Sequence, residues 1–445
     1  MAVDTDTDAE KHLKPPSAGS PSSSSDQLPP GPELGPATTA VSPPPDGGFR
    51  AWCAVLGAWC CLFCSFGWIN CIGIFEAQYQ QNQLSAYPPG VVAWIPSIEV
   101  FVMYLTMPVH GKLYDNYGPK PLLYAGTLFH VFGLMMASLS TEYYQILLSQ
   151  SICSAIGAAA VFSAAMGAVG GWFLHRRALA LGIVASGSSL SACILPIMVT
   201  RLGPLVGFAW ALRICAFMFL FLLIIACLVL ESRHPPKPTP WELMAFFRPL
   251  GEKAFLLNAV GLAFFSGGMF VPFNFLVLEA QYRGMGSDLA NYQIAILNGV
   301  SIFGRIIPGW LGDKVGRFNV MIVTTALSAV AVLALWIPAP TNSTAATVVF
   351  ASVFGFTSGT FVGMTPALVL QMSPEVREMG IRLGTTFGVI SIAALTSNPI
   401  AGGLVSRDDG GYLYLKIFAG LALGVGSALI LLSRCVQAGW NWKRI

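Results

Sequence analysis

The sequence predicts an all-α polytopic membrane protein with twelve transmembrane helices, arranged as two six-helix halves. Of the 445 residues, 55% are hydrophobic and only 10% are charged, and the mean hydropathy is +0.66. A soluble domain carries roughly 25% charged residues, so this deficit points to a lipid environment. The apolar residues fall into twelve runs, and one charged turn occurs twice at matching places.

The repeated turn marks the two halves. It reads GKLYDNYGPK from Gly111 to Lys120 and GWLGDKVGR from Gly309 to Arg317. Each copy follows the second apolar run of its half and holds an acid, Asp115 or Asp313. Glycine allows a tight turn, and the Asp is expected to cap the next helix or to pair with a base across the repeat. The chain therefore reads as two copies of one membrane unit.

Each apolar run is long enough for a span of about 20 residues. The first half is expected over 46–232, with runs near 46–75, 91–110, 121–138, 146–170, 178–200 and 207–230. A proline-rich cytosolic linker follows over 233–253. The second half is expected over 254–434, with runs near 254–278, 291–309, 319–338, 345–370, 384–404 and 411–433.

The amino-terminal tail over 1–45 is rich in Ser and Pro and has no apolar run. It cannot bury enough surface to order itself, so we expect a disordered cytosolic tail. No apolar segment follows the start, which argues against a signal peptide. A short cytosolic tail is also expected over 435–445.

The distribution of Lys and Arg predicts the orientation. Twelve would lie in inner loops if both termini are cytosolic: Lys112, Lys120, Arg176, Arg177, Arg233, Lys237, Arg248, Lys253, Lys314, Arg317, Arg377 and Arg382. Five would lie outside: Arg201, Arg213, Arg283, Arg407 and Lys416. This bias favours cytosolic termini. We expect a multi-pass protein of the cell membrane, with the vacuolar membrane second, and a glycosylation acceptor at Asn342.

Several function classes are disfavoured. The net charge of +3 gives no reason to expect a nucleic-acid partner. The chain has no phosphate-binding loop and no paired acids or HExxH motif inside its spans, so we do not expect an enzyme. Cys60, Cys61 and Cys64 lie in one apolar run without nearby His or acid, where Cys acts as a small apolar residue. No metal or cofactor is expected.

Two further stretches carry a family resemblance. The first reads DGGFRAW from Asp46 to Trp52, and the second reads WFLHRRALALGI from Trp172 to Ile183. They resemble the two signature motifs of the monocarboxylate porter family in its fungal branch, and the repeated turn resembles the cytoplasmic loop of the major facilitator superfamily. The resemblance covers about 46–434. It implies halves related by an axis along the membrane normal and secondary transport by alternating access, often with a proton beside a monocarboxylate.

Charges inside spans are costly and therefore informative. Arg305 lies within an apolar run, and its guanidinium can bind a carboxylate with two parallel hydrogen bonds. The resemblance implies an acid four residues before this Arg, but the chain has Ser301 there. The expected proton carrier is therefore missing from this helix. We hypothesise that Glu99 carries the coupling proton or pairs with Arg305 across a central cavity.

The remaining candidate residues are expected to line the substrate cavity or to gate access to it. Asn70, Asn274 and Asn298 are polar positions within spans and are expected to face the cavity. The resemblance suggests a gating role for the basic pair Arg176 and Arg177. We expect these two to pair with the loop acids when the inner gate is shut, and the gating set is Asp115, Arg176, Arg177, Asp313 and Arg317.

The sequence thus favours a secondary transporter of a small organic molecule, an organic anion or a secondary metabolite, with efflux as one direction. Two alternatives stay open: a proton-coupled uptake permease for a monocarboxylate or vitamin, and a nutrient sensor that does not transport. The expected partners are the substrate, a co-transported proton and the lipid bilayer, with a monomer as the transport unit.

Overall fold

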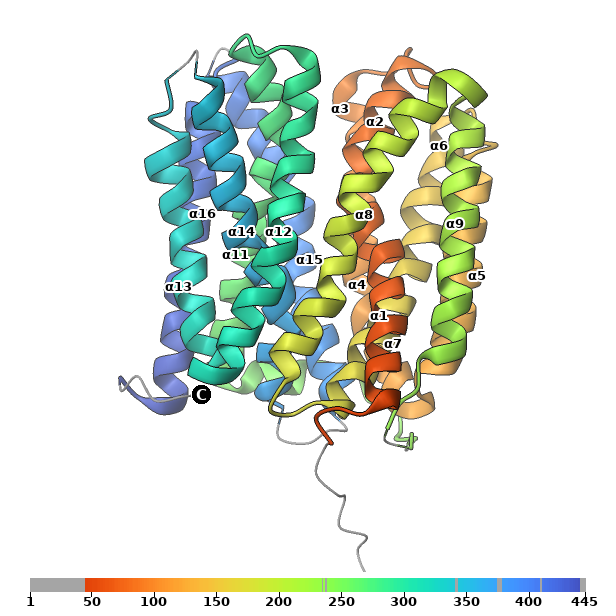
Figure 1. The fold of residues 1–445 in the computed structure, drawn as a ribbon, viewed down its shortest axis with the longest axis vertical. Helices are drawn as coiled ribbons and strands as arrows, with labels where there is room; N and C mark the ends of the chain where they lie inside the picture. Colours follow the sequence, from red (N-terminus) through yellow and green to blue (C-terminus); the bar gives the residue numbers. More distant parts are fainter. Residues whose placement is uncertain are drawn as a thin grey trace, which may run out of the picture. The chain divides into compact units, whose positions relative to one another are not determined.

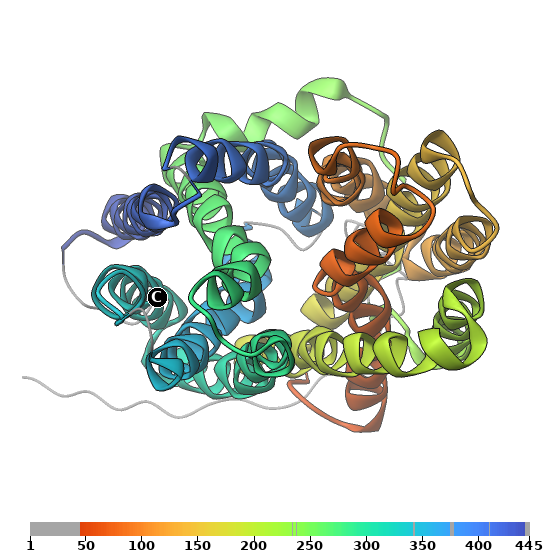
Figure 2. The same ribbon diagram turned by 90° about the horizontal axis from the view of Figure 1, so that it is seen from above.

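The computed structural model describes residues 45–233, 235–236, 238–340, 343–373, 378–408 and 410–440. Within these residues the chain forms helices and connecting turns without a β-strand. The helices stand roughly parallel in two groups that follow the two halves of the sequence (Figure 1). Figure 2 shows the groups side by side, seen along the helices. The all-α architecture in two halves is therefore confirmed.

The first half begins with a broken helix. Helix α1 (Phe49–Ile69) continues into α2 (Ile72–Gln81) across a turn at Asn70 and Cys71. The π-helical stretch η1 lies inside another long helix, and such stretches are frequent at functional sites. The remaining elements are α3 (Pro89–Val92), α4 (Trp94–Tyr117), α5 (Pro119–Ala137), α6 (Tyr143–Ile146), η1 (Leu147–Ser154), α7 (Ala155–Trp172), α8 (Arg177–Val206) and α9 (Phe208–Val229).

The second half begins after a connecting segment that contains two short helices. Its six long helices correspond to the six apolar runs of the sequence. The elements are α10 (Leu243–Phe247), η2 (Arg248–Gly251), α11 (Lys253–Tyr282), α12 (Ser287–Val315), α13 (Arg317–Val330), η3 (Ala331–Trp336), α14 (Thr344–Gln371), α15 (Met379–Arg407) and α16 (Leu413–Ala438).

Among the described residues, eleven helices are long and apolar enough to cross a membrane. The one remaining apolar run, near 121–138, forms α5, a helix of 19 residues. Its Lys120 and His130 lower its hydropathy, yet 19 residues suffice for a span. Helix α5 packs between α7 and α9, so it completes the first group of six.

The two copies of the repeated turn have the same backbone. Gly118 separates α4 from α5 with a φ of 76°, and Gly316 separates α12 from α13 with a φ of 109°. A residue with a Cβ rarely adopts this conformation, so glycine is required at both turns. The repeat in sequence is a repeat in structure.

Two pairs of helices make the most extensive contacts between the halves. Helix α4 packs along α15, and α8 packs along α12; we name these contacts the α4–α15 seam and the α8–α12 seam. Both seams are tight at the end of the bundle where α1 begins and α16 ends, which we name the terminal end (lower in Figure 1). There Gly111 contacts the backbone of Gly380, and a Cβ at Gly309 would lie 2.6 Å from the carbonyl oxygen of Ala178.

Candidate functional site

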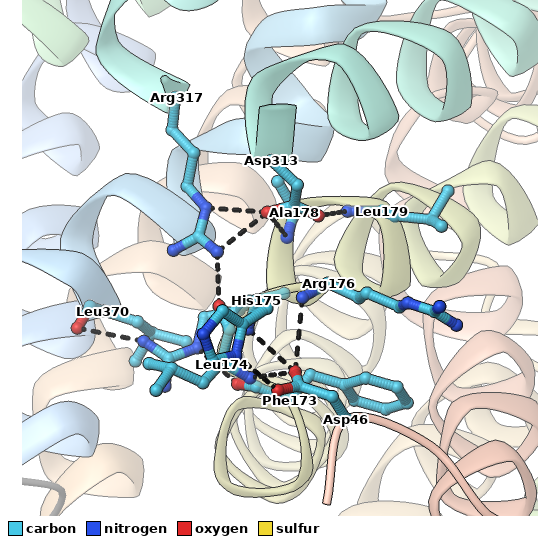
Figure 3. A network of polar contacts seen from close by, with 11 residues as sticks. Asp46, Phe173, Leu174, His175, Arg176, Ala178, Leu179, Asp313, Arg317 and Leu370 are labelled. Carbon is cyan, nitrogen blue, oxygen red and sulfur yellow. Dashed lines mark hydrogen bonds and ion pairs between the residues drawn. The ribbon is translucent and has the colours of Figure 1, made fainter. Parts of the chain in front are cut away.

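Asp313, near the end of α12, binds the start of α8 in the other half. Its carboxylate accepts hydrogen bonds from the backbone N–H groups of Ala178 at 3.1 Å and Leu179 at 2.9 Å (Figure 3). It also accepts from the guanidinium of Arg317 at 2.8 Å. The first N–H groups of a helix lack internal partners, and an acid there satisfies them. Asp313 therefore caps a helix of the opposite half and not the next helix.

Asp115 makes the equivalent contact on the other seam. Near the end of α4, it accepts from the backbone N–H groups of Gly380 at 3.3 Å and Ile381 at 3.1 Å, at the start of α15. The acid of each half thus caps a helix of the other half. We name these two contacts the capping locks. Both contacts join the halves at the terminal end.

A third acid, Asp46, fixes the turn before α8. It accepts from the N–H groups of Leu174 at 2.6 Å and His175 at 2.8 Å, and from the His175 ring at 2.7 Å. The N–H of Arg176 lies 3.3 Å away. Burial acts to raise the pKa of Asp46, but the hydrogen bonds from the His175 side chain and the backbone outweigh it, and the pKa lies below its usual value.

Arg176 and Arg177 do not pair with the loop acids in this closed arrangement. Arg176 joins the network through its backbone N–H. The Arg177 side chain donates to the carbonyl oxygen of Phe173 at 2.8 Å and to that of Leu370, across the halves, at 3.4 Å. The expected partners differ because the acids are already engaged by helix N–H groups. Arg177 links the halves by binding carbonyl groups.

Arg305 lies in the α8–α12 seam with 1% of its surface exposed. Its guanidinium donates to the carbonyl oxygen of Ala185 at 2.5 Å and to the hydroxyl of Ser188. Within its own helix it donates to the Ser301 hydroxyl at 3.3 Å. Among the described residues no carboxylate lies within ion-pair distance of Arg305. In this structure the buried Arg305 guanidinium is therefore held by neutral oxygen acceptors.

Glu99 lies in the first half and is 1% exposed. Its two carboxylate oxygens accept from the indole N–H of Trp68 at 2.6 Å and from the amide of Gln150 at 2.8 Å. Gln150 in turn accepts from the hydroxyl of Tyr79 at 2.6 Å. Glu99 is therefore bound within one half and does not pair with Arg305 here. The network joins α1, α2, α4 and η1 across the break at Asn70.

The three asparagines occupy different surroundings. Asn298 is fully buried, and its amide donates to the carbonyl oxygen of Ile294 on its own helix. Asn274 is exposed and donates to Asn398 of α15 at 2.7 Å. The side-chain nitrogen of Asn70 is buried without a hydrogen-bond partner in the described structure. Asn342, the predicted glycosylation acceptor, lies outside the described residues.

Sequence reasoning missed several partners of these residues. Ser188 and the carbonyl group of Ala185 hold Arg305, and nothing local in the sequence pairs them with it. Gln150, a polar residue in an apolar run, was a detectable signal. Glu279 and Lys416 were also missed; they form a buried ion pair that joins α11 and α16.

Two six-helix halves that meet in two seams, closed at one end by reciprocal acid caps, define a membrane transporter of the alternating-access class. The chain matches the sequence profile of the Major Facilitator Superfamily over residues 58–381. It belongs to this superfamily and is a transporter, not an enzyme.

Curated relatives extend over most of the chain. It is 49% identical over 395 residues to "MFS-type transporter 1" of Ophiocordyceps sp., covering 89% of this chain and 87% of that protein. It is 46% identical to the "Fujikurins efflux protein" of Gibberella fujikuroi, covering 88% and 84%. It is 35% identical to the "Aspyridones efflux protein apdF" of Emericella nidulans, covering 90% and 81%.

Solved structures show the same fold. A variant of the E. coli fucose:proton symporter FucP aligns with a TM-score of 0.65 at 15% identity, covering 85% of this chain and 98% of FucP. A second structure of FucP, described as the outward conformation, aligns with a TM-score of 0.63 at 14% identity. At this identity the likeness bears on the fold alone.

Proposed function

We propose that the protein exports an organic anion, a secondary metabolite, from the cytosol across the cell membrane. The observation that carries this proposal is Arg305, a buried cation in the α8–α12 seam whose partners are all neutral. Relatives with 46% and 35% identity are named efflux proteins for fujikurins and aspyridones. The monocarboxylate porter resemblance of the Asp46–Trp52 and Trp172–Ile183 motifs agrees with an anionic substrate.

The terminal end is the cytosolic end in this proposal, because most Lys and Arg outside the spans lie there. The halves 46–232 and 254–434 move against each other, and the linker 233–253 connects them. The closed capping locks then correspond to a state shut toward the cytosol. Asp115, Asp313 and Arg317 act as gating residues. Arg176 and Arg177, at the start of α8, support Asp313 and Arg317 at the α8–α12 seam.

An anion can couple its binding to this motion. A carboxylate that reaches Arg305 competes with Ala185 and Ser188 for the guanidinium. Those two contacts cross the α8–α12 seam, so their loss weakens the closed state. Ser301 and Asn298 lie on the same helix and supply polar groups beside the cation, and Asn70 and Asn274 are the further lining candidates.

The membrane potential favours this direction. Moving one negative charge out of a cell whose interior is negative releases about 2.3 kcal/mol per 100 mV. That energy corresponds to a concentration ratio of about 40-fold, because about 1.4 kcal/mol equals tenfold. A proton exchanged for the anion would add to the drive. Glu99 is our candidate for that proton, since its buried carboxylate has only uncharged hydrogen-bond partners.

The test uses the purified protein in liposomes with labelled aromatic and aliphatic carboxylates, with and without an imposed pH gradient and potential. We expect carboxylate flux that Arg305→Ala abolishes and Arg305→Lys partly restores. Arg201→Ala, an exposed Arg at the outer part of α8, is the matched control and should transport normally. Normal flux in Arg305→Ala would remove the anion site from this proposal.

A second arm tests the proton. Glu99→Gln keeps the shape of the side chain and its acceptor oxygen for Trp68 but cannot release a proton. We expect flux that no longer responds to the pH gradient while the response to the potential remains. An unchanged pH response in this variant would withdraw Glu99 as the proton site and leave the Arg305 assignment intact.

A further inference from the structure

Four aromatic rings from four helices meet at the α4–α15 seam. Phe387 of α15 lies 5.2 Å from Phe162 of α7 and 5.4 Å from Tyr104 of α4, measured between ring centroids. It also lies 6.2 Å from Phe66 of α1. All four side chains are buried. One ring of the second half therefore sits in a socket made by three rings of the first half.

The socket does not depend on Phe387 for its shape. Phe66 lies 4.6 Å from Phe162 and 5.7 Å from Tyr104, and all three belong to the first half. They move as one body when the halves separate. We name Phe66, Tyr104 and Phe162 the aromatic socket.

The repeat shows what corresponds to Phe387 on the other seam. Gly384 of α15 packs against the carbonyl oxygen of Met107, and Gly182 of α8 packs against that of Arg305. Both contacts are close enough to exclude a side chain. Gly384 and Gly182 therefore occupy equivalent positions. Three residues after them, Phe387 of α15 corresponds to Ala185 of α8, whose carbonyl oxygen accepts a hydrogen bond from Arg305.

The two seams thus have the same backbone packing and opposite chemistry. The α8–α12 seam places a cation and hydroxyl groups where the α4–α15 seam places aromatic rings. On the terminal side of the rings, Phe162 and Phe387 line a small cavity of about 10 Å³, close to the minimum for one water molecule. Residues of both halves, among them Gly111 and Gly380, line the rest of this cavity.

Opening of the terminal end must draw α15 away from α4 and withdraw Phe387. The aromatic socket is then empty and faces the compartment at the terminal end. Three rings without their fourth partner form an apolar site suited to a flat ring, which stacks or meets them edge to face.

We propose that the vacated aromatic socket binds the aromatic or conjugated ring system of the transported anion, in place of Phe387. This inference rests on the proposed function and deepens it, since it assigns the substrate class: a carboxylate or other anion held at Arg305 that also carries a flat, unsaturated ring. Phe387 and the substrate ring then compete for one site. Release on the far side follows when the halves close and Phe387 returns.

The test measures equilibrium binding of two labelled probes to the purified full-length protein: 2-naphthoate, an aromatic anion, and decanoate, an aliphatic anion of the same charge. Binding needs no transport, so it is independent of the flux experiment. We expect Phe162→Leu to weaken 2-naphthoate binding about tenfold or more and to leave decanoate within about twofold. Phe354→Leu removes a buried ring of α14 whose ring contacts, to Phe273 and Phe350, stay within the second half; it is the matched control and should change neither.

Phe387→Leu gives the decisive contrast. This variant removes the competing ring and keeps the socket, so 2-naphthoate should bind as tightly as in the wild type or more tightly. A purely structural role predicts that Phe162→Leu and Phe387→Leu weaken both probes alike, and that result would overturn the inference. If Arg305→Ala abolishes binding of the probes but Phe162→Leu and Phe387→Leu bind them like the wild type, the socket inference is also overturned. The proposed function would then remain in place. Failure of both probes to bind the wild type would reject both proposals.

Discussion

Gly384 has no side chain at the point where α15 crosses α4. A Cβ there would lie 2.6 Å from the carbonyl oxygen of Met107 and 2.5 Å from the Cα of Pro108. These are backbone atoms of a packed helix and cannot swing aside. The same arrangement occurs at Gly182 on the other seam, against Arg305. Single glycines therefore decide how closely the halves approach.

We predict that Gly384→Ala prevents complete closure of the terminal end. Overpacking of this kind costs about 1–3 kcal/mol, which should lower transport by about 5- to 150-fold. The measurement is flux in liposomes together with the yield of folded protein. Gly203→Ala in α8 is the matched control, because nothing lies within 4 Å of a Cβ at that position. Equal flux in both variants would contradict the role of Gly384.

Asp46 gives a prediction for pH. Its pKa in the folded protein lies below its usual value, so its contribution to stability is present above the unfolded pKa and is lost only as the pH falls through the folded pKa. Between pH 5 and 8 that contribution should be constant.

The measurement for Asp46 compares melting temperatures of Asp46→Asn and its parent at pH 5, 6, 7 and 8. It is made with His175 in place, because the hydrogen bond from its ring is one of the contacts that lower the Asp46 pKa. We expect the variant to melt lower by the same amount at each pH. A difference that disappears at pH 5 would show that Asp46 is already protonated there.

At the scale of helices, the outer end of the second half is held by a buried ion cluster. Glu279 of α11 pairs with Lys416 of α16 and with Arg283. The indole N–H of Trp336 in η3 donates to the same carboxylate at 3.3 Å. One acid therefore joins three elements, at a place where Glu279 and Lys416 are both buried.

We predict that Glu279→Gln strongly destabilises the protein, because it leaves two cations without their carboxylate. Removing one partner of a buried pair typically costs about 3–5 kcal/mol. The measurement is thermal unfolding in detergent. The double variant Glu279→Leu with Lys416→Met removes the charges of that pair and leaves only the Arg283 cation without its carboxylate, so it should recover part of the loss. If the single variant melts like the wild type, the cluster does not hold these helices together.

At the scale of the whole molecule, the proposed mechanism makes closure depend on two equivalent contacts. Asp115 caps α15 and Asp313 caps α8, so each half donates one acid and receives one. Both must break before the terminal end opens. An N-terminal cap of this kind contributes about 0.5–2 kcal/mol.

We predict that Asp115→Ala and Asp313→Ala, which remove the capping oxygens, each raise the population open at the terminal end and that the double variant raises it further. The measurement is labelling of a single Cys at Ser163, which lines the small cavity between the halves, in an otherwise Cys-free protein. Asp408→Ala is the matched control, since Asp408 lies in the loop between α15 and α16 and accepts from the N–H of Leu413 at the start of α16, within one half. Labelling that is equally slow in all variants would show that the locks do not govern opening.

The sequence by itself determined the bundle, because the bilayer requires long apolar helices and each run had the length for one. It also determined the repeat, since Gly118 and Gly316 adopt a backbone that only glycine tolerates well. It identified Arg305 and Glu99, because a charge in an apolar run is visible without a structure.

Only the tertiary structure decided the partners. Asp115 and Asp313 cap helices that lie 265 and 135 residues away in the chain, and no local pattern encodes such distances. Glu99 binds Trp68 and Gln150, and Phe387 enters a socket of three rings, because helices from separate parts of the sequence pack at those depths. The length of an apolar run is enough to predict each membrane helix separately. The contacts in a seam depend on the shapes of two helices that meet only in the folded protein.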